Sequence, residues 1–324
     1  MLSLNAKDLK ILQVIADHGR LPYTEIGHYA RLSKDSVKSR INGLLQRQII
    51  LSFVPLIDYS KLGYEFFYVF IKFGALVKKR DIFINRVKKN GYVVAVTRVI
   101  GEYDYELQVL AKNTQQLYST LNDMLLPIKK DVSRINVVNA SSFYLYSMQI
   151  GKFNEKFNQP KRILYSSHNH MDQMDLDILK RLSINARESF VSLAQVIKTT
   201  PENIRYHIKK LIESGIILSF HARTNKHALG LNTYIFLLDI FGGLTPKDLL
   251  FLKEKENIYC IRNCAGQWNI IINFYVENNA KLAEILETLR NYFKSKLNTY
   301  ELLIILDRHK FAPVPEKVVI QNIA

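Results

Sequence analysis

The segment Ile50-Leu51-Ser52-Phe53 occurs a second time, unchanged, as Ile217-Leu218-Ser219-Phe220. The same offset of 167 residues superposes Asp8-Leu9-Lys10-Ile11-Leu12 on Asp175-Leu176-Asp177-Ile178-Leu179. Chance similarity does not keep register over so long a span. We therefore expect two tandem copies of one unit, with a period too long for a solenoid.

Each copy opens with a pattern of three helical segments. In the third segment Val37, Ile41, Leu44 and Leu45 fall on one apolar stripe. Ser33 is a good N-cap for this helix, and Thr200-Pro201-Glu202 marks the corresponding start in the second copy. About three residues join the second and third segments, which is typical of a helix-turn-helix. Extended residues 49–55, a turn and residues 59–63 predict a β-hairpin wing.

Beyond this wing the pattern becomes strand-helix-strand-strand-helix-strand, which is typical of a ferredoxin-like fold. The predicted class is therefore α+β, with two tandem copies of a winged helix-turn-helix plus a ferredoxin-like βαββαβ (RAM-like) domain. The strands and helices are expected at 66–73, 78–89, 92–100, 105–111, 114–126 and 132–138, then at 234–240, 246–255, 258–264, 270–276, 280–297 and 300–306. The expected domains are 1–63 and 171–230 (winged helix-turn-helix), 64–140 and 231–312 (ferredoxin-like effector and dimerisation), 141–170 (linker) and 313–324 (C-terminal tail).

The composition favours a polyanionic partner. The 324 residues carry 45 Lys and Arg against 29 Asp and Glu, a formal net charge of +16, which suits nucleic acid or an anionic surface. No signal-peptide pattern is present, because Lys7, Asp8 and Lys10 interrupt any apolar region. Cys260 and Cys264 are too far apart on one strand for a disulfide. We expect a soluble protein in a reducing cytoplasm.

Three motifs resemble those of the Lrp/AsnC (feast/famine) regulators, over nearly the whole chain and twice. The opening Leu-Asp-x-x-Asp-x-x-Ile-Leu resembles residues 4–12 and, more closely, residues 171–179. The recognition-helix pattern Ser-x-x-x-Val-x-x-Arg-Ile-x-x-Leu matches Ser33, Val37, Arg40, Ile41 and Leu44, and in the second copy Thr200, Ile204, His207, Ile208 and Leu211. The family's Gly-x-x-Asp turn matches Gly101 and Asp104, with Gly266 and Asn269 in the second copy.

The resemblance implies a sequence-specific regulator of transcription that binds double-stranded DNA and responds to a small effector such as an amino acid. In the family, effectors bind near the Gly-x-x-Asp turn, so the candidate effector-binding residues are Gly101, Asp104, Gly266 and Asn269. Ordinary turn chemistry explains the same residues equally well. Two departures from the family are the duplication and the missing glycine in the helix-turn-helix turn.

A recognition helix places its outward, N-terminal side chains in the major groove. The candidate DNA-binding residues are Lys34, Ser36, Lys38, Ser39, Arg40, Asn203, Arg205, Tyr206, His207 and Lys209. Arg40 has three alternatives, which are to read a base, to contact phosphate or to brace its own domain. Because the two helices differ in nearly every outward residue, the copies should read different half-sites, or one copy has lost DNA binding.

Two other functions remain as alternatives. A branch of the same fold decarboxylates sirohaem with histidines and arginines of its effector-like domain, but no histidine here falls in the expected sheet around Gly101 or Gly266. A Gly-rich phosphate loop, a nucleophile elbow and a carboxylate pair in a recognisable frame are also missing, and His168 and His170 form a lone His-x-His without further ligands. The expectation is therefore no enzyme, no cofactor and no metal. The other alternative is an architectural protein that binds DNA without sequence preference.

The duplication predicts how the protein assembles. A flexible linker of about thirty residues has a mean span of roughly 30 Å, enough for the two copies to meet. Covalent linkage raises their effective concentration to about the millimolar range, which favours pairing within one chain. We expect an intrachain pseudo-dimer on an imperfect palindrome, with further homo-oligomers open.

Overall fold

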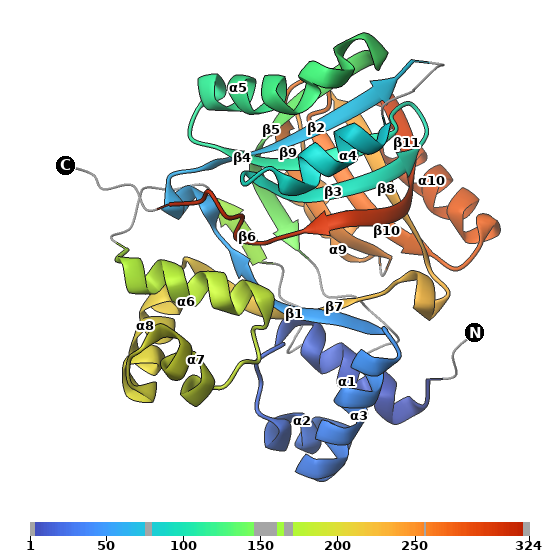
Figure 1. The fold of residues 1–324 in the computed structure, drawn as a ribbon. Coiled ribbons are helices and arrows are strands. Elements are labelled where there is room, and N and C mark those ends of the chain that lie inside the picture. The colour runs from blue at the N-terminus through green and yellow to red at the C-terminus, as the bar shows by residue number, and fades with distance from the viewer. Residues whose placement is uncertain (1–3, 75–79, 146–160, 165–170, 256, 320–324) are drawn as a thin grey trace.

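A computed structural model describes residues 4–74, 80–145, 161–164, 171–255 and 257–319. Two three-helix units lie at one end of the molecule and a nine-stranded sheet lies at the other, with a two-stranded ribbon between them (Figure 1). The first unit contains α1 (Ala6–Asp17), α2 (Tyr23–Ala30) and α3 (Lys34–Gln46). The second contains α6 (Gln173–Ile184), α7 (Phe190–Ile197) and α8 (Pro201–Glu213).

The two recognition helices begin where the sequence predicts. The Ser33 hydroxyl accepts a hydrogen bond from the Ser36 amide, and the Thr200 hydroxyl accepts one from the Asn203 amide. The turns before them contain no glycine. Arg31 and Lys198 take the left-handed conformation instead, with φ of 54° and 62°, which costs a residue with a side chain about 1–2 kcal/mol. The matching positions therefore carry matching strain.

The predicted hairpin wing is wrong. Residues after β1 (Ile50–Ile57) do not return alongside it, because Tyr59–Leu62 forms a 3-10 helix that is capped by the Asp58 side chain. The edge of β1 pairs instead, antiparallel, with β7 (Ile217–Thr224) of the second half. Ile50 lies opposite Thr224, and Ile57 lies opposite Ile217. The two strands form a ribbon between the helical units and the large sheet.

Each half then follows the order βαββαβ, and the observed elements lie close to the expected ranges. In the first half they are β2 (Glu65–Phe73), α4 (Arg80–Lys89), β3 (Val93–Ile100), β4 (Tyr105–Ala111), α5 (Thr114–Leu125) and β5 (Val132–Leu145). In the second half they are β8 (Asn232–Ile240), α9 (Pro246–Lys253), β9 (Ile258–Ala265), β10 (Ile270–Val276), α10 (Asn279–Phe293) and β11 (Leu297–Phe311).

Strands β5 and β11 are longer than predicted, and their extra length joins the halves. β5 pairs with β2 over its first part and with β9 over its second. β11 pairs with β8 and then with β3 in the same way. The order β2-β4-β3-β11-β8-β10-β9-β5 therefore closes on itself through the β2–β5 pairing. A short strand, β6 (Lys161–Leu164), pairs with β5 inside the expected linker.

The outer face of the closed sheet supplies two apolar cores, and its inner face belongs to a third. Helices α4 and α5 cover a cluster that includes Phe83 and Leu107, whereas α9 and α10 cover one that includes Phe236 and Phe293 (Figure 1). The largest cluster runs from both helical units through the ribbon to the inner sheet face. No helix in the described part of the chain is long and apolar enough to cross a bilayer.

The segment after β11, expected as a tail from residue 313, packs against the protein as far as the structure describes it. Val314 and Val318 are buried. The Tyr59 hydroxyl donates a hydrogen bond to the Pro313 carbonyl at 2.8 Å, so this segment fastens the end of the second half to the 3-10 helix of the first.

Candidate nucleic-acid interface

The outward face of α3 contains exposed polar and charged side chains. Lys34, Lys38 and Ser39 are exposed, while Val37 and Ile41 are buried against the unit. Ser36 is half-buried, and its hydroxyl lies 3.0 Å from the Ser33 hydroxyl. Three of the predicted residues are therefore free to meet a ligand, and Ser36 belongs to the helix cap.

The outward face of α8 has a different chemistry at the same positions. Arg205, Tyr206 and Lys209 are exposed, and they occupy the positions that Lys38, Ser39 and Asn42 hold in α3. Asn203 faces inward in part, because its amide group donates hydrogen bonds to the Thr199 hydroxyl and to the Met174 sulfur. The two helices therefore share one cationic position, Lys38 and Arg205, and differ at the rest.

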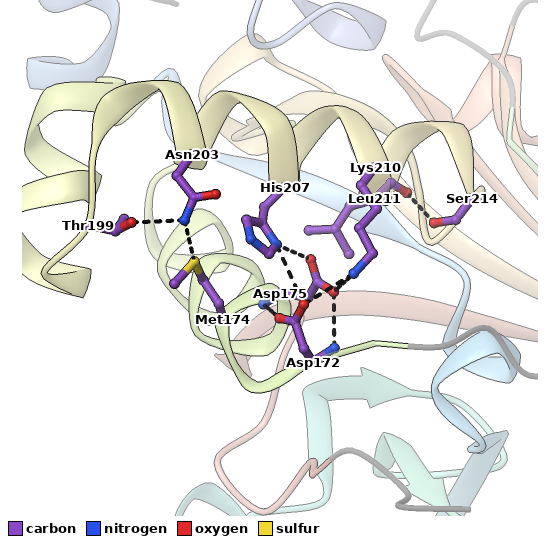
Figure 2. Close-up of polar contacts among 9 residues, drawn as sticks. All are labelled: Asp172, Met174, Asp175, Thr199, Asn203, His207, Lys210, Leu211 and Ser214. Atoms are coloured by element: carbon purple, nitrogen blue, oxygen red, sulfur yellow. Dashed lines mark hydrogen bonds and ion pairs between the residues drawn. The ribbon is translucent and has the colours of Figure 1, made fainter.

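Arg40 and His207 do not face outward as predicted. Arg40 pairs with Asp8 of α1 at 2.8 Å. His207, at the matching position of α8, is 8% exposed, and its Nδ1 lies 2.7 Å from Asp175 (Figure 2). Asp8 and Asp175 also match each other in the two halves. In both units the recognition helix is braced to the first helix by one ionisable pair, and this corresponds to the bracing alternative for Arg40.

The brace of the second unit carries an additional cation. Lys210 donates hydrogen bonds to Asp175 at 2.6 Å and to Asp172 at 3.2 Å (Figure 2). The hydrogen bond to Asp175 is the main reason why the pKa of Lys210 is raised. Asp172, Asp175 and His207 lie close enough together to hold a metal ion. However, Lys210 already supplies the positive charge there, and Asp172 and Asp175 also form the capping box of α6.

A symmetric joint fixes the two helical units to the ribbon and to each other. The Gly19 amide donates to the Phe220 carbonyl at 2.7 Å, and the Ala186 amide donates to the Phe53 carbonyl at 2.8 Å. The Arg187 guanidinium donates to the Gly19 carbonyl, and that of Arg20 donates to the Ala186 carbonyl. Each donor and acceptor in one half has its counterpart in the other. The recognition helices are therefore held in a defined relative placement.

The two predicted effector turns are occupied by contacts within the chain. The Asp104 carboxylate accepts a hydrogen bond from the Phe73 amide at 2.7 Å, and Asn269 bonds both polar backbone atoms of Ile240. Gly101, at φ 140°, lies against β11, and Gly266, at φ 143°, lies against β5. Asp104 and Asn269 therefore hold neighbouring backbone and the two glycines lie against the other half, while effector binding at these turns stays a prediction.

One aromatic residue from each of these turns contacts the other where the two halves meet. Tyr103 is fully buried and Trp268 is 2% exposed. The Trp268 indole donates to the Tyr103 hydroxyl at 3.4 Å, a long contact. Matching positions of the two turns therefore touch, so both turns belong to the contact between the halves.

A cavity of about 460 Å³ lies between the ribbon and the large sheet. Its wall includes His221, Arg223, Lys226 and Arg308. Sequence reasoning missed these residues as a group, because they lie on β7, β11 and a connecting turn and meet only through contacts between distant segments. The only available signal was the cluster of basic residues from 221 to 227.

Comparison with known proteins gives two family matches. Residues 171–217 match the winged helix-turn-helix DNA-binding family, and residues 68–148 match the Lrp/AsnC ligand binding domain family.

Several archaeal regulators are similar in sequence. An HTH-type transcriptional regulator from Pyrococcus furiosus is 32% identical over 125 residues, which are 37% of this chain and 83% of the relative. One from Pyrococcus abyssi is 30% identical over 36% of this chain and 79% of its own length. The regulator Ptr1 from Methanocaldococcus jannaschii is 32% identical over 31% of this chain and 69% of its own length.

Among solved structures, the siroheme decarboxylase NirDL resembles this chain over nearly its whole length. The TM-score is 0.63 and the identity 13%, with 94% of this chain and 93% of that chain covered. At this identity the likeness shows the fold alone.

Proposed function

Because the chain belongs to the Lrp/AsnC family of transcription regulators, we propose that it is a single-chain DNA-binding regulator made of two tandem copies of the family's unit. The two copies pair with each other and present α3 and α8 to one operator. In this arrangement one chain does what two identical subunits do in a symmetric dimer.

The symmetric joint between the helical units carries this proposal. Its two amide-to-carbonyl hydrogen bonds, from Gly19 to Phe220 and from Ala186 to Phe53, use matching positions of the two halves. The lengths of the relatives point the same way, because one relative aligned over 83% of its own length covers only 37% of this chain. The β1–β7 ribbon gives the joint a second set of hydrogen bonds.

The residues proposed to meet DNA are the exposed members of the predicted set, namely Lys34, Lys38, Ser39, Arg205, Tyr206 and Lys209. Lys38 and Arg205 face the groove from matching positions, and Arg205 can bond two atoms of a guanine. Arg40 and His207 act through position, because each ties its recognition helix to the first helix of the unit. Since Ser39 and Tyr206 differ in size and chemistry, the preferred operator is an imperfect palindrome.

Selection of bound duplexes from a random pool tests the proposal. We expect one preferred site that binds one chain, with log affinity falling by roughly 0.9 per phosphate contact for each unit of log salt. Equal affinity for selected and random duplex would instead support an architectural protein. A perfect palindrome bound by two chains would contradict the intrachain arrangement.

A second candidate function is decarboxylation of an iron tetrapyrrole. The observation that favours it is that His221, Arg223 and Arg308 face one cavity in a chain whose fold resembles NirDL. The test is to titrate the protein with sirohaem while recording the absorption spectrum, followed by mass analysis of the tetrapyrrole. Loss of carboxyl groups would establish the enzyme, whereas an unchanged tetrapyrrole would exclude it.

A further inference from the structure

The cavity between the ribbon and the sheet is lined by matching positions of the two halves. From the first half it receives Val54, Leu56, Tyr59, Phe66 and Val94, which are apolar or aromatic. From the second half it receives, at the corresponding positions, His221, Arg223, Lys226, Thr233 and Tyr259, of which Tyr259 matches Val94 as the second residue of β9 and β3 respectively. The pseudo-symmetry of the backbone therefore encloses a space whose two walls differ in chemistry.

The wall from the first half is largely apolar, with Asp17 and Gln108 as its polar members. Val54, Tyr59, Phe66 and Val94 are each less than 9% exposed. The rings of Tyr59 and Phe66 lie 5.4 Å apart, and Tyr68 continues the stack at 5.1 Å from Phe66. Such a wall favours the apolar body of a ligand.

The wall from the second half concentrates positive charge in Arg223, Lys226 and Arg308. Among the residues that the structure describes, no carboxylate forms an ion pair with Arg223, Lys226 or Arg308; the acidic lining residues Asp17 and Asp307 pair with His221 and His309. The Lys226 amine donates a hydrogen bond to the Thr224 hydroxyl at 2.7 Å and lies 5.8 Å from the centre of the Tyr259 ring.

These cations repel one another. Burial and the neighbouring Arg308 lower the pKa of Lys226 to about 7 and that of Arg223 to about 10. The Arg223 guanidinium lies 4.0 Å from the centre of the Phe311 ring, so its position is fixed by packing. Like charges that are held close together destabilise the folded protein, and a bound anion among them offsets their repulsion.

We propose that this cavity binds a small ligand with an oxyanion head, carboxylate or phosphate, and an apolar body. The head meets Arg223, Lys226 and Arg308, and the body lies on Phe66 and its neighbours. A volume of about 460 Å³ lies in the range of sites for small metabolites.

The position of the cavity gives the ligand a route to the DNA-binding helices. This step rests on the proposed function. β1 begins at Ile50, four residues after α3 ends, and β7 begins at Ile217, four residues after α8 ends. A ligand that spans Leu56 and Arg223 on the ribbon and Tyr259 and Arg308 on the sheet fixes the ribbon against the sheet. It therefore acts on the relative placement of α3 and α8.

Two fluorescent dyes test the binding of an anion on the full-length protein. Anilinonaphthalenesulfonate has an aromatic body and an anionic head, and N-phenylnaphthylamine has the same body without the charge. We expect one sulfonate dye per chain, bound about tenfold more tightly than the neutral dye, because charge-assisted hydrogen bonds favour the head. Equal affinity of the two dyes would overturn the proposal. Competition by octanoate and by octyl phosphate distinguishes the two head groups.

Replacing cavity residues of the second half by their counterparts in the first half tests where the dye binds. Arg223→Leu and Lys226→Tyr install the residues found at the matching positions, Leu56 and Tyr59. Each is expected to weaken the sulfonate dye about tenfold and to leave the neutral dye unchanged. Arg86→Leu, at an exposed position on α4, is the matched control and should bind both dyes like wild type. Dye binding that survives both cavity substitutions would place the anion elsewhere.

Measuring duplex affinity with and without dye distinguishes anion binding in the cavity from its effect on DNA binding. With the selected duplex, saturating sulfonate dye should change the affinity of the wild type and leave that of Arg223→Leu unchanged. If the dye binds in the cavity and duplex affinity stays constant, the coupling is wrong. If no duplex binds even without dye, the proposed function fails, and the dye titration still decides whether the cavity holds an anion.

Discussion

At corresponding positions, the two halves carry the same residues in the joint and at the carboxylate of the brace. They carry different residues on the outward helix face and in the cavity. Arg20 and Arg187 make the same joint, and Asp8 and Asp175 anchor the same brace. In contrast, Ser39 is replaced by Tyr206 on the outward helix face, and Leu56 by Arg223 in the cavity. Positions on the outward helix face and in the cavity, which are available to ligands, are therefore among those that differ.

Corresponding positions can make the same contact with different residue types. Arg40 and His207 differ in size and charge, yet each pairs with the carboxylate at the corresponding position of its own first helix, Asp8 or Asp175. The shorter histidine leaves room for Lys210, whereas the first half has Gly43 at that position. The second brace therefore has more partners and a more deeply buried carboxylate than the first.

The largest expected effect comes from the contact of the Gly101 turn with β11. A Cβ atom at Gly101 would lie 2.8 Å from both the Leu302 carbonyl oxygen and a methyl group of Leu303, at a φ of 140°. Gly101→Ala should therefore lower the free energy of unfolding by about 4 kcal/mol, because backbone strain and overpacking add, measured by urea denaturation. Gly43→Ala is the control, because nothing lies within 4 Å of a Cβ there, and it should stabilise α3. A stable Gly101→Ala protein would show that the two halves do not pack as described.

The braces should differ in strength. Asp175 is fully buried and pairs with His207 and Lys210, so Asp175→Ala should cost about 3 kcal/mol of stability. Asp8→Ala should cost about 1 kcal/mol, because Arg40 is one-third exposed. Thermal unfolding of both variants is the measurement. Equal costs would mean that Lys210 adds nothing to the second brace.

The outward faces can be compared by transplanting one residue. Tyr206→Ser places the side chain of Ser39 on α8. It should change the preferred sequence of one half-site only, by about tenfold in relative affinity, if Tyr206 contacts a base. Repeating the duplex selection with this variant gives the result. A change in both half-sites, or in neither, contradicts the separate reading of α3 and α8.

The smallest effect is expected at Lys209, whose amine is exposed and 3.5 Å from Glu213. Lys209→Ala should weaken all duplexes alike and reduce the salt slope by about one phosphate contact. Affinity for selected and random duplexes, measured across salt, tests this. Altered sequence preference would assign Lys209 to base reading instead.

Local patterns in the sequence predicted most of the elements but not the pairings between halves. Apolar spacing and caps such as Ser33 place the helices, because these signals act within a few residues. The partner of β1 lies 167 residues away, and no local pattern can reveal it, so the strand was assigned to a hairpin. The extra lengths of β5 and β11 were missed for the same reason.

The site was predicted in part. Exposed positions on the recognition helices follow from the apolar stripe, which correctly separates Lys38 and Arg205 from the core. His207 was misplaced because the period of the helix puts it at the border of the stripe. Its match with Arg40, and that of Asp175 with Asp8, could have suggested a pair. The cavity could not be predicted, since its walls come from both halves.

The pairing of distant strands also bears on how the protein is made. The first half leaves the ribosome with the edges of β1, β3 and β5 unpaired, and their partners β7, β11 and β9 are synthesised later. At about 5–20 residues per second, the wait for β11 is on the order of ten seconds or more. During that interval the nascent chain exposes three open edges that can pair with another nascent copy. We therefore expect the yield of correctly closed molecules to depend on the spacing between ribosomes on one messenger and on chaperones at the exit tunnel.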